Sequence, residues 1–144
     1  RRGRRAPVPP PSGGRMSDDA PSPRILLVED DAAIREALIE VLVELGYEVV
    51  SAPDGLRGLG LAAAQDTPCP ILLDWRMPVL DGPAFLARLR ELPRGTEFPV
   101  ILSTGDRSAT AAAVGDQVAG VLSKPFDLAS LVAVLDRVSP RRAN

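Results

Sequence analysis

Short apolar runs recur along this chain without polar interruption, and each ends abruptly at polar residues. Residues 71–73 are Ile-Leu-Leu and are followed by Asp74, with Pro78 four residues later. A run without polar alternation predicts a strand buried on both faces, as in a parallel sheet. The carboxylate of Asp74 then stands at the carboxyl end of that strand, which is the edge where open α/β sheets bind ligands.

The segments between the apolar runs carry apolar residues at helical spacings of three and four, which predict amphipathic helices. Asp31 is placed to cap the first helix and Gly46 to end it, whereas Gly58 and Gly60 should weaken the second. Alternating strands and helices with short connections favour one parallel sheet covered by helices on both faces. Strands are expected at 25–28, 47–52, 71–74, 99–103 and 118–122, and helices at 32–45, 55–65, 85–92, 109–114 (a short helix at best) and 128–139.

Charge is distributed unevenly along the chain. The formal net charge is −2, but residues 1–15 contain five arginines and no acid, so the remaining residues carry −7. An acidic body argues against direct DNA binding by the folded domain. We expect a disordered Arg/Pro-rich tail over residues 1–22, one folded domain over 23–139 and a short tail over 140–144. The basic tail could touch nucleic acid or acidic lipid, although a solvated tail is the simpler interpretation.

Composition also limits the chemistry. The chain has no long apolar run and no apolar secretory segment at its start, so we expect no membrane association and a cytoplasmic location. One cysteine rules out an internal disulfide, and the lack of histidine argues against a zinc site. A hard cation held by carboxylates remains open.

Polar groups stand at four of the expected strand ends. They are the acidic run 29–31, Asp74, Thr104 and Lys124. Taken singly, each has an ordinary explanation, since an acid after a strand commonly caps the next helix. Because the carboxyl ends of parallel strands share one edge, however, all four should converge. Clustered carboxylates suit Mg²⁺, a free carboxylate can act as a nucleophile, and a hydroxyl and an ammonium can stabilise charge on a transferring phosphoryl group.

The same residues carry a family resemblance. The motifs are Ile25-Leu-Leu-Val-Glu-Asp-Asp31, Leu72-Leu-Asp74-Trp-Arg-Met-Pro78 with Asp81-Gly82, Ser103-Thr104-Gly105 and Ser123-Lys124-Pro125-Phe126. In this order they resemble the receiver domain of two-component response regulators over about residues 24–138. The resemblance implies a flavodoxin-like (βα)5 fold, a three-layer α/β sandwich whose parallel five-stranded sheet has the order 2-1-3-4-5.

The resemblance also implies a metal-dependent phosphoacceptor. Asp74 would receive the phosphoryl group. Asp30 would bind Mg²⁺ directly and Glu29 would bind it through water, while Asp74 and the backbone carbonyl of Arg76 would complete the ligands from the protein.

Thr104 and Lys124 would contact the phosphoryl group, but three features depart from the family pattern. The switch position that works with Thr104 is commonly aromatic and is Val121 here. The interval from Thr104 to Lys124 is shorter than usual, which trims the fourth helix. Arg76 and Asp106 flank the expected path of an attacking water, so this pair could prolong the phosphorylated state, with a chance solvated pair as the alternative.

The function implied by the resemblance is a stand-alone signalling receiver that is not itself an enzyme. It would accept a phosphoryl group on Asp74 from a histidine kinase or a histidine phosphotransfer protein, with Mg²⁺ as cofactor. Since little sequence follows the last expected helix, its output would be contact with a downstream protein partner or onward phosphotransfer. It would act as a monomer or weak dimer.

Other functions are compatible with parts of the pattern. An adaptor with a receiver fold and vestigial phosphorylation is favoured by Val121 and the trimmed helix, and is opposed by the intact acids, threonine and lysine. An aspartyl-phosphate phosphohydrolase would favour a second aspartate where Arg76 stands. A dinucleotide-binding protein would need a Gly-rich loop after the first strand, and this chain has none there.

Overall fold

A computed structural model describes residues 22–105 and 118–138. Within these residues, strands alternate with helices as the apolar runs predicted. The strands are β1 (Arg24–Val28), β2 (Glu48–Ala52), β3 (Ile71–Asp74), β4 (Val100–Thr104) and β5 (Gly120–Ser123). The helices are α1 (Ala32–Glu44), α2 (Gly55–Ala63), α3 (Gly82–Arg90), the short 3₁₀ helix η2 (Gly95–Glu97) and α5 (Leu128–Val138). The helix expected over residues 109–114 lies outside the described residues.

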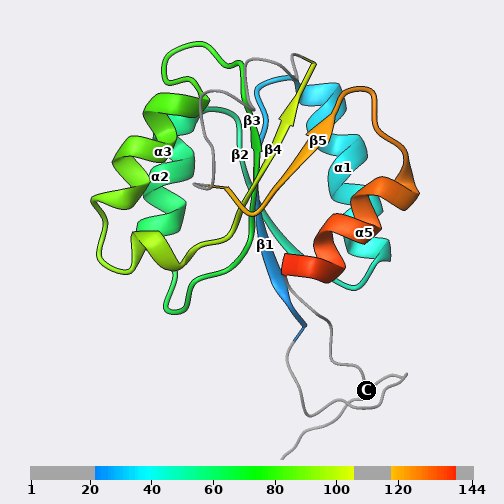
Figure 1. Ribbon diagram of the computed structural model, residues 1–144, viewed down its shortest axis with the longest axis horizontal. Coiled ribbons are helices and arrows are strands. Elements are labelled where there is room, and N and C mark those ends of the chain that lie inside the picture. Colours follow the sequence, from blue (N-terminus) through cyan, green and yellow to red (C-terminus); the bar gives the residue numbers. More distant parts are fainter. Residues whose placement is uncertain (1–21, 106–117, 139–144) are drawn as a thin grey trace, which may run out of the picture.

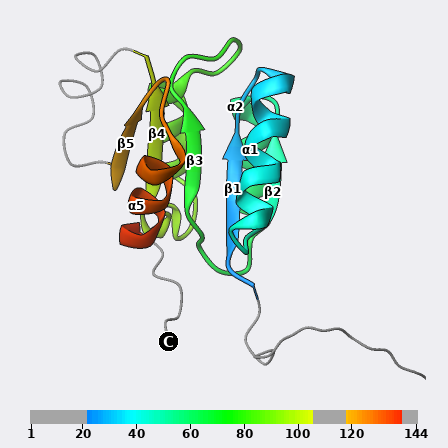
Figure 2. The same cartoon turned by 90° about the vertical axis from the view of Figure 1, so that its right-hand side faces the viewer.

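The five strands form one parallel sheet in the order β2-β1-β3-β4-β5. This order confirms the predicted flavodoxin-like fold. The chain moves outward from β1 to β2 and then returns past β1 to β3, so the direction of winding reverses between β1 and β3. Helices therefore cover both faces of the sheet, with α2 and α3 on one face and α1 and α5 on the other (Figure 1). Seen from the side of α1 and α5, the strands lie behind these two helices (Figure 2).

Two apolar cores fill the space between the sheet and its helices, and β3 contributes to both. Ile71 and Leu73 belong to the core under α2 and α3, whereas Leu72 belongs to the core under α1 and α5. All three residues are at most 1% exposed. Because both faces of β3 are covered, every position before Asp74 is apolar, and burial of each such side chain stabilises the fold by roughly 1.5–3 kcal/mol.

Aspartates determine where the helices begin. The side chains of Asp31, Asp54 and Asp81 each accept a hydrogen bond from the backbone N–H three residues later, at 2.8 to 3.0 Å. Asp127 accepts one from the backbone N–H of Ser130 at 2.9 Å. Asp31, Asp54 and Asp127 cap helices shortly after β1, β2 and β5 end, so these three loops at the carboxyl edge of the sheet are short. The loop from β3 to Asp81 is longer.

Two glycines of the α1–α2 region have different structural roles. Gly46 follows α1 with a φ of 100°, a left-handed conformation that ends the helix as predicted. Gly58 lies inside α2, where a Cβ atom would be 2.8 Å from Cγ2 of Val28 and 3.2 Å from Cε2 of Phe85. The glycine that weakens α2 by propensity therefore allows the helix to approach β1 and α3 closely.

The lengths of some elements differ from those predicted. β5 begins at Gly120 rather than at residue 118, and α2 ends at Ala63 rather than near residue 65. β5 is an edge strand in which only Leu122 is buried, so no uniform apolar run marks its limits. The helices are short, and none among the described residues is long and apolar enough to cross a membrane.

Candidate functional site

Three carboxylates meet at the carboxyl edge of the sheet. Glu29 and Asp30 follow β1, and Asp74 is the last residue of β3. One carboxylate oxygen from each lies within 4.8 Å of the other two. Glu29 and Asp74 are 2% and 5% exposed, whereas Asp30 is exposed to solvent. The predicted convergence of these acids, which are far apart in sequence, therefore occurs.

An ammonium group reaches the same cluster from the end of the edge strand β5. The Nζ atom of Lys124, just after β5, lies 3.2 Å from Oδ1 of Asp74 and 3.7 Å from Oε1 of Glu29. Its backbone N–H donates to the carbonyl of Thr104 at 2.7 Å, which continues the pairing of β4 and β5 past the end of the strands. The side chain of Lys124 remains 30% exposed. One cation thus faces two buried anions, with the third anion at the surface.

Glu29 is fixed in place by its neighbours in the β1–α1 turn. Its Oε2 atom accepts a hydrogen bond from the backbone N–H of Asp31 at 3.1 Å, and its carbonyl accepts one from the guanidinium of Arg35 at 2.8 Å. The pKa of Glu29 is raised to about 7, chiefly by burial and in smaller part by the charge of Asp74, while the Asp31 N–H and Lys124 oppose the shift. Near neutral pH the side chain is therefore poised between its protonated and charged forms.

The carboxyl group of Asp74 is in a similar environment. Burial is the main cause that raises its pKa, and the neighbouring carboxyl group of Asp30 adds to the effect. Lys124 opposes the shift through its charge and hydrogen bond without cancelling it. The cluster therefore carries more negative charge than its surroundings stabilise. An all-oxygen donor set with uncompensated negative charge fits a hard divalent cation such as Mg²⁺.

The end of β4 brings two hydroxyl groups to this edge. Thr104, the predicted phosphoryl-binding residue, is the last residue of β4 and is 2% exposed. Ser103 precedes it, is also 2% exposed, and is the residue of β4 in register with Asp74. Ser103 was not predicted to have a role of its own, because the sequence does not show whether its hydroxyl finds a hydrogen-bond partner.

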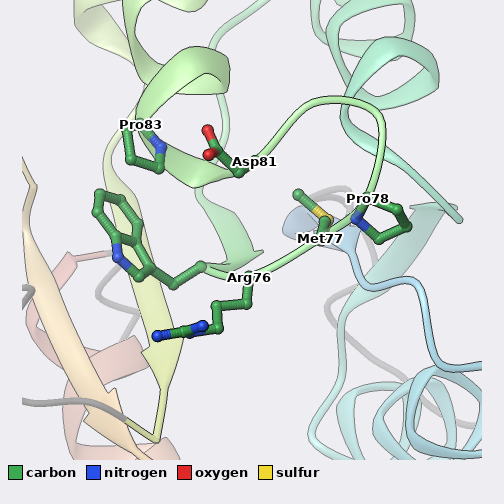
Figure 3. A pocket seen from close by; sticks show the side chains of 6 residues that line it. Arg76, Met77, Pro78, Asp81 and Pro83 are labelled. Atoms are coloured by element: carbon green, nitrogen blue, oxygen red, sulfur yellow. The ribbon is translucent and has the colours of Figure 1, made fainter.

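The loop after β3 lies beside the acidic cluster and lines a pocket of about 480 Å³. Arg76, the predicted metal ligand through its carbonyl, is exposed, and its side chain extends away from Asp81 across this pocket (Figure 3). Trp75 forms part of the lining but is only 6% exposed. The pocket is lined by Trp75, Arg76, Met77, Pro78, Asp81 and Pro83, so it adjoins the acidic cluster without including it.

The remaining predicted residues lie away from the acids or beyond the described structure. Val121 is on the edge strand β5 and is 39% exposed. Asp106, the proposed companion of Arg76, lies outside the described residues. A second residue that the sequence did not reveal is Arg35, whose bond to the Glu29 carbonyl depends on how α1 leaves β1.

Comparison with known proteins extends these observations. A family model described as the response regulator receiver domain matches residues 25–136. The transcriptional regulatory protein PrrA of Mycobacterium tuberculosis is 36% identical over 136 residues, which cover 90% of this chain and 55% of that protein. The response regulator MprA of Mycobacterium bovis is 38% identical over 133 residues, which cover 85% of this chain and 54% of that protein. This chain spans about half the length of these relatives.

Solved structures show the same fold. The receiver domain of the sensor histidine kinase PA1611 of Pseudomonas aeruginosa, crystallised with a magnesium ion coordinated in its active site cleft, is 31% identical with a TM-score of 0.74. That match covers 81% of this chain and 97% of the other. The chemotaxis protein CheY4 of Vibrio cholerae is 30% identical with a TM-score of 0.72, covering 82% of this chain and 99% of the other. The sheet order, the family match and these relatives agree: this chain belongs to the response regulator receiver domains of two-component systems.

Proposed function

We propose that this receiver domain accepts a phosphoryl group on Asp74, with Mg²⁺ as cofactor, from a histidine kinase or a histidine phosphotransfer protein. The observation that carries the proposal is the meeting of three carboxylates within 4.8 Å with an ammonium 3.2 Å from Asp74. Caps and turns do not require this combination. A phosphoacceptor does, because it needs a nucleophile, a cation site and a donor for the phosphoryl oxygens.

The acidic cluster is the proposed metal site. Asp30 and Asp74 would hold Mg²⁺ directly, Glu29 would bind it through water, and the carbonyl of Arg76 would complete the ligands from this chain. Two of these carboxyl groups have raised pKa values, so they gain most from a nearby cation. When bound, Mg²⁺ supplies positive charge that offsets the charge on phosphoryl oxygens.

Transfer is a substitution at phosphorus. An oxygen of the Asp74 carboxylate forms a bond to the phosphorus atom while the bond from phosphorus to the donor histidine nitrogen breaks. The bonding electron pair stays with the imidazole, and Asp74 becomes an acyl phosphate. The carboxylate must be ionised to act as nucleophile, and the contact with Lys124 favours that form because the ammonium opposes the rise in its pKa.

Lys124 and Thr104 are the proposed ligands of the transferred group. The Nζ atom of Lys124 already lies beside Oδ1 of Asp74, so it can follow the charge as that charge moves onto the phosphoryl oxygens. Thr104 ends the neighbouring strand at the same edge, with its carbonyl bonded to the backbone of Lys124. A shift of either side chain toward the phosphoryl group is therefore transmitted to the β4–β5 end of the sheet.

Labelling with a small phosphodonor tests the proposal directly. The chain is incubated with acetyl phosphate or phosphoramidate and Mg²⁺, and incorporation of one phosphoryl group is followed by intact mass. Asp74→Asn should abolish labelling, as should removal of Mg²⁺ with a chelator. Asp54→Asn is the matched control, because asparagine still caps α2 and Asp54 is not part of the cluster. Labelling that persists in Asp74→Asn would refute the assignment.

The lifetime of the acyl phosphate is proposed to depend on Arg76. Its exposed side chain lines the pocket formed by the loop after β3, the loop that follows Asp74 and would carry a metal-binding carbonyl. Arg76→Ala should raise the rate of dephosphorylation while leaving the site of labelling unchanged. A dephosphorylation rate equal to that of the unaltered chain would remove Arg76 from this role.

A second candidate function is an adaptor that binds partners through the receiver fold and does not use phosphorylation. Val121 favours it, because this position is partly exposed and lacks the aromatic ring expected of the family switch. The two candidates differ in one measurement. If the chain fails to label with phosphodonor and Mg²⁺ but still binds a partner protein, the adaptor is the better description.

A further inference from the structure

Ser103 presents a buried hydroxyl group that has no hydrogen-bond partner among the described residues. The residue is 2% exposed, so bulk water does not reach it. A buried polar group without a partner is unfavourable, and such groups in folded proteins call for an explanation. The proximity of Ser103 to the proposed phosphoacceptor suggests where that explanation lies.

The pairing of strands places Ser103 on the face of the sheet that carries the site. Ser103 is in register with Asp74 on β3 and with Leu122 on β5. Register partners in parallel strands project to the same face, and Leu122 belongs to the core under α1 and α5. The Ser103 side chain therefore lies next to that of Asp74, one layer above Ile101 of the same strand.

The path of Lys124 crosses this position. Lys124 stands two residues after Leu122, on the same face, and reaches from the β5 side to Asp74 on β3. β4 lies between these two strands, so the span from Lys124 to Asp74 crosses the β4 position in register with Asp74, which is Ser103. No other strand separates the ammonium from the carboxylate.

The chemistry of the site indicates which group the Ser103 hydroxyl could bind. An ammonium has three N–H donors, and Lys124 makes its close contact with one oxygen of Asp74. When that oxygen bonds to phosphorus, the ammonium turns one N–H toward the phosphoryl oxygens, and its other donors need acceptors within the site. The remaining buried acid is Glu29, whose Oε1 atom lies 3.7 Å away, beyond ordinary hydrogen-bond distance. The hydroxyl oxygen of Ser103, which is in register with Asp74 and has no other hydrogen-bond partner among the described residues, can accept a hydrogen bond from this ammonium.

We propose that Ser103 is a positioning residue for Lys124, whose ammonium donates a hydrogen bond to the Ser103 hydroxyl oxygen whenever it leaves the Asp74 carboxylate. The hydroxyl keeps the ammonium inside the site during the transfer rather than letting it move to solvent. This inference rests on the proposed function for its role in transfer, although the contact itself does not depend on phosphorylation.

A stability cycle tests the contact without metal or phosphodonor. In the unaltered chain Ser103→Ala removes an unpartnered group, so the melting temperature should stay the same or rise. In the Asp74→Ala chain Lys124 has lost its partner and should use Ser103, so adding Ser103→Ala should lower the melting temperature by about 3 °C. Equal effects of Ser103→Ala in the two chains would overturn the proposal.

Phosphodonor labelling tests the role in transfer. Ser103→Thr keeps the hydroxyl, and Ser103→Val has the same shape without it. Ser103→Val should be labelled roughly 5- to 20-fold more slowly than Ser103→Thr, on the scale of one lost hydrogen bond to a charged group. The affinity for Mg²⁺, followed through the fluorescence of Trp75, should agree within about 2-fold between the two variants. Equal labelling rates for Thr and Val would contradict the role in transfer.

The two tests separate this inference from the proposed function. If the unaltered chain is not labelled at all, the proposed function fails, and the stability cycle still decides whether Ser103 holds Lys124. If the chain is labelled but the cycle shows no sign of coupling, the proposed function stands and Ser103 is only a packing residue.

Discussion

At the scale of single residues, Glu29 combines almost complete burial with a place in a cluster of like charges. Its pKa is raised from 4.5 to about 7, mainly by burial. In the unfolded chain the group releases its proton near the ordinary value, whereas the folded chain holds the proton to higher pH. The stability contributed by the protonated form is therefore complete below the unfolded pKa and is lost as the pH rises through the folded pKa.

This shift predicts that the metal-free protein becomes less stable between about pH 4.5 and pH 7. At about 1.4 kcal/mol per pKa unit, the loss from Glu29 is on the order of 3 kcal/mol. Urea unfolding at a series of pH values, with a chelator present, measures it. Glu29→Gln should remove most of this slope and should be more stable than the unaltered chain at pH 8. A slope that is unchanged in Glu29→Gln would mean that other carboxylates, such as Asp74, dominate.

Val79 has a strained backbone conformation, which lowers the stability of the fold locally. It lies in the loop after β3 with a φ of 71° and is 77% exposed. A β-branched residue in the left-handed region is strained, and an exposed side chain gains little from packing. Val79→Gly should therefore raise the free energy of unfolding by roughly 0.5–1 kcal/mol, the relief of strain less the extra flexibility of glycine.

Val43→Gly is the matched control for that prediction, since Val43 is 54% exposed within α1. The same substitution there should destabilise the protein by a similar amount, because glycine is unfavourable inside a helix. Urea unfolding of both variants gives the comparison. Destabilisation at both sites would show that the Val79 backbone is not a source of strain.

At the scale of elements, two glycines of α2 allow the effect of helix propensity on stability to be measured apart from the effect of packing. Gly60 has no heavy atom within 4 Å of a Cβ built on it, whereas a Cβ on Gly58 would be 2.8 Å from Val28. Gly60→Ala should therefore stabilise the protein by about 0.5–1 kcal/mol through propensity alone. Gly58→Ala should destabilise it by roughly 1–3 kcal/mol, because α2 must move away from β1. Thermal unfolding of the two variants measures this opposite response, and stabilisation by both would contradict the close approach.

The order and type of the helices and strands could be predicted because buried positions are occupied by apolar residues, and their spacing differs between strands and helices. A strand such as β3, covered on both faces, must be apolar throughout, and an aspartate that caps a helix is readable at Asp31 and Asp127. The limits of β5 were less predictable, since an edge strand is only partly covered. The role of Gly58 was missed for a related reason: propensity is a local property, and the approach of α2 to Val28 is set by the sheet.

The site shows the same division. The convergence of Asp30, Asp74 and Lys124 could be predicted because parallel strands bring their carboxyl ends to one edge, wherever the residues stand in sequence. The role of Ser103 could not, because an unpartnered hydroxyl is a property of its three-dimensional surroundings. Arg35 was equally hidden, since its contact depends on the turn between β1 and α1.

At the scale of the whole molecule, the acidic cluster should couple metal binding to stability. The proposed Mg²⁺ would bind the folded chain, where the three carboxylates meet, and not the unfolded chain, where they are far apart. At a concentration 100 times the dissociation constant it should therefore raise the free energy of unfolding by about 2.7 kcal/mol. The stabilisation by Mg²⁺ should be larger at pH 8 than at pH 5.5, because at the lower pH protons compete with the metal for carboxyl groups whose pKa values are raised.

Two neighbouring substitutions control this prediction. Asp30→Asn removes an exposed member of the cluster and should abolish most of the stabilisation by Mg²⁺. Asp31→Asn keeps the cap of α1 and leaves the cluster intact, so the stabilisation should persist. Thermal unfolding with and without Mg²⁺ provides the measurement. If Asp30→Asn responds to Mg²⁺ as strongly as Asp31→Asn, the metal binds elsewhere.

The position of Lys124 along the chain has a consequence for how the protein matures. Lys124 follows Asp74 by 50 residues and joins the site only when β5 has docked on β4. During synthesis, the ribosome releases all three acids before the lysine that offsets their charge. A nascent chain without β5 would bring these acids together without the ammonium of Lys124. If Asp74 is the phosphoacceptor, competence to take a phosphoryl group would therefore appear last, once Lys124 has joined the site.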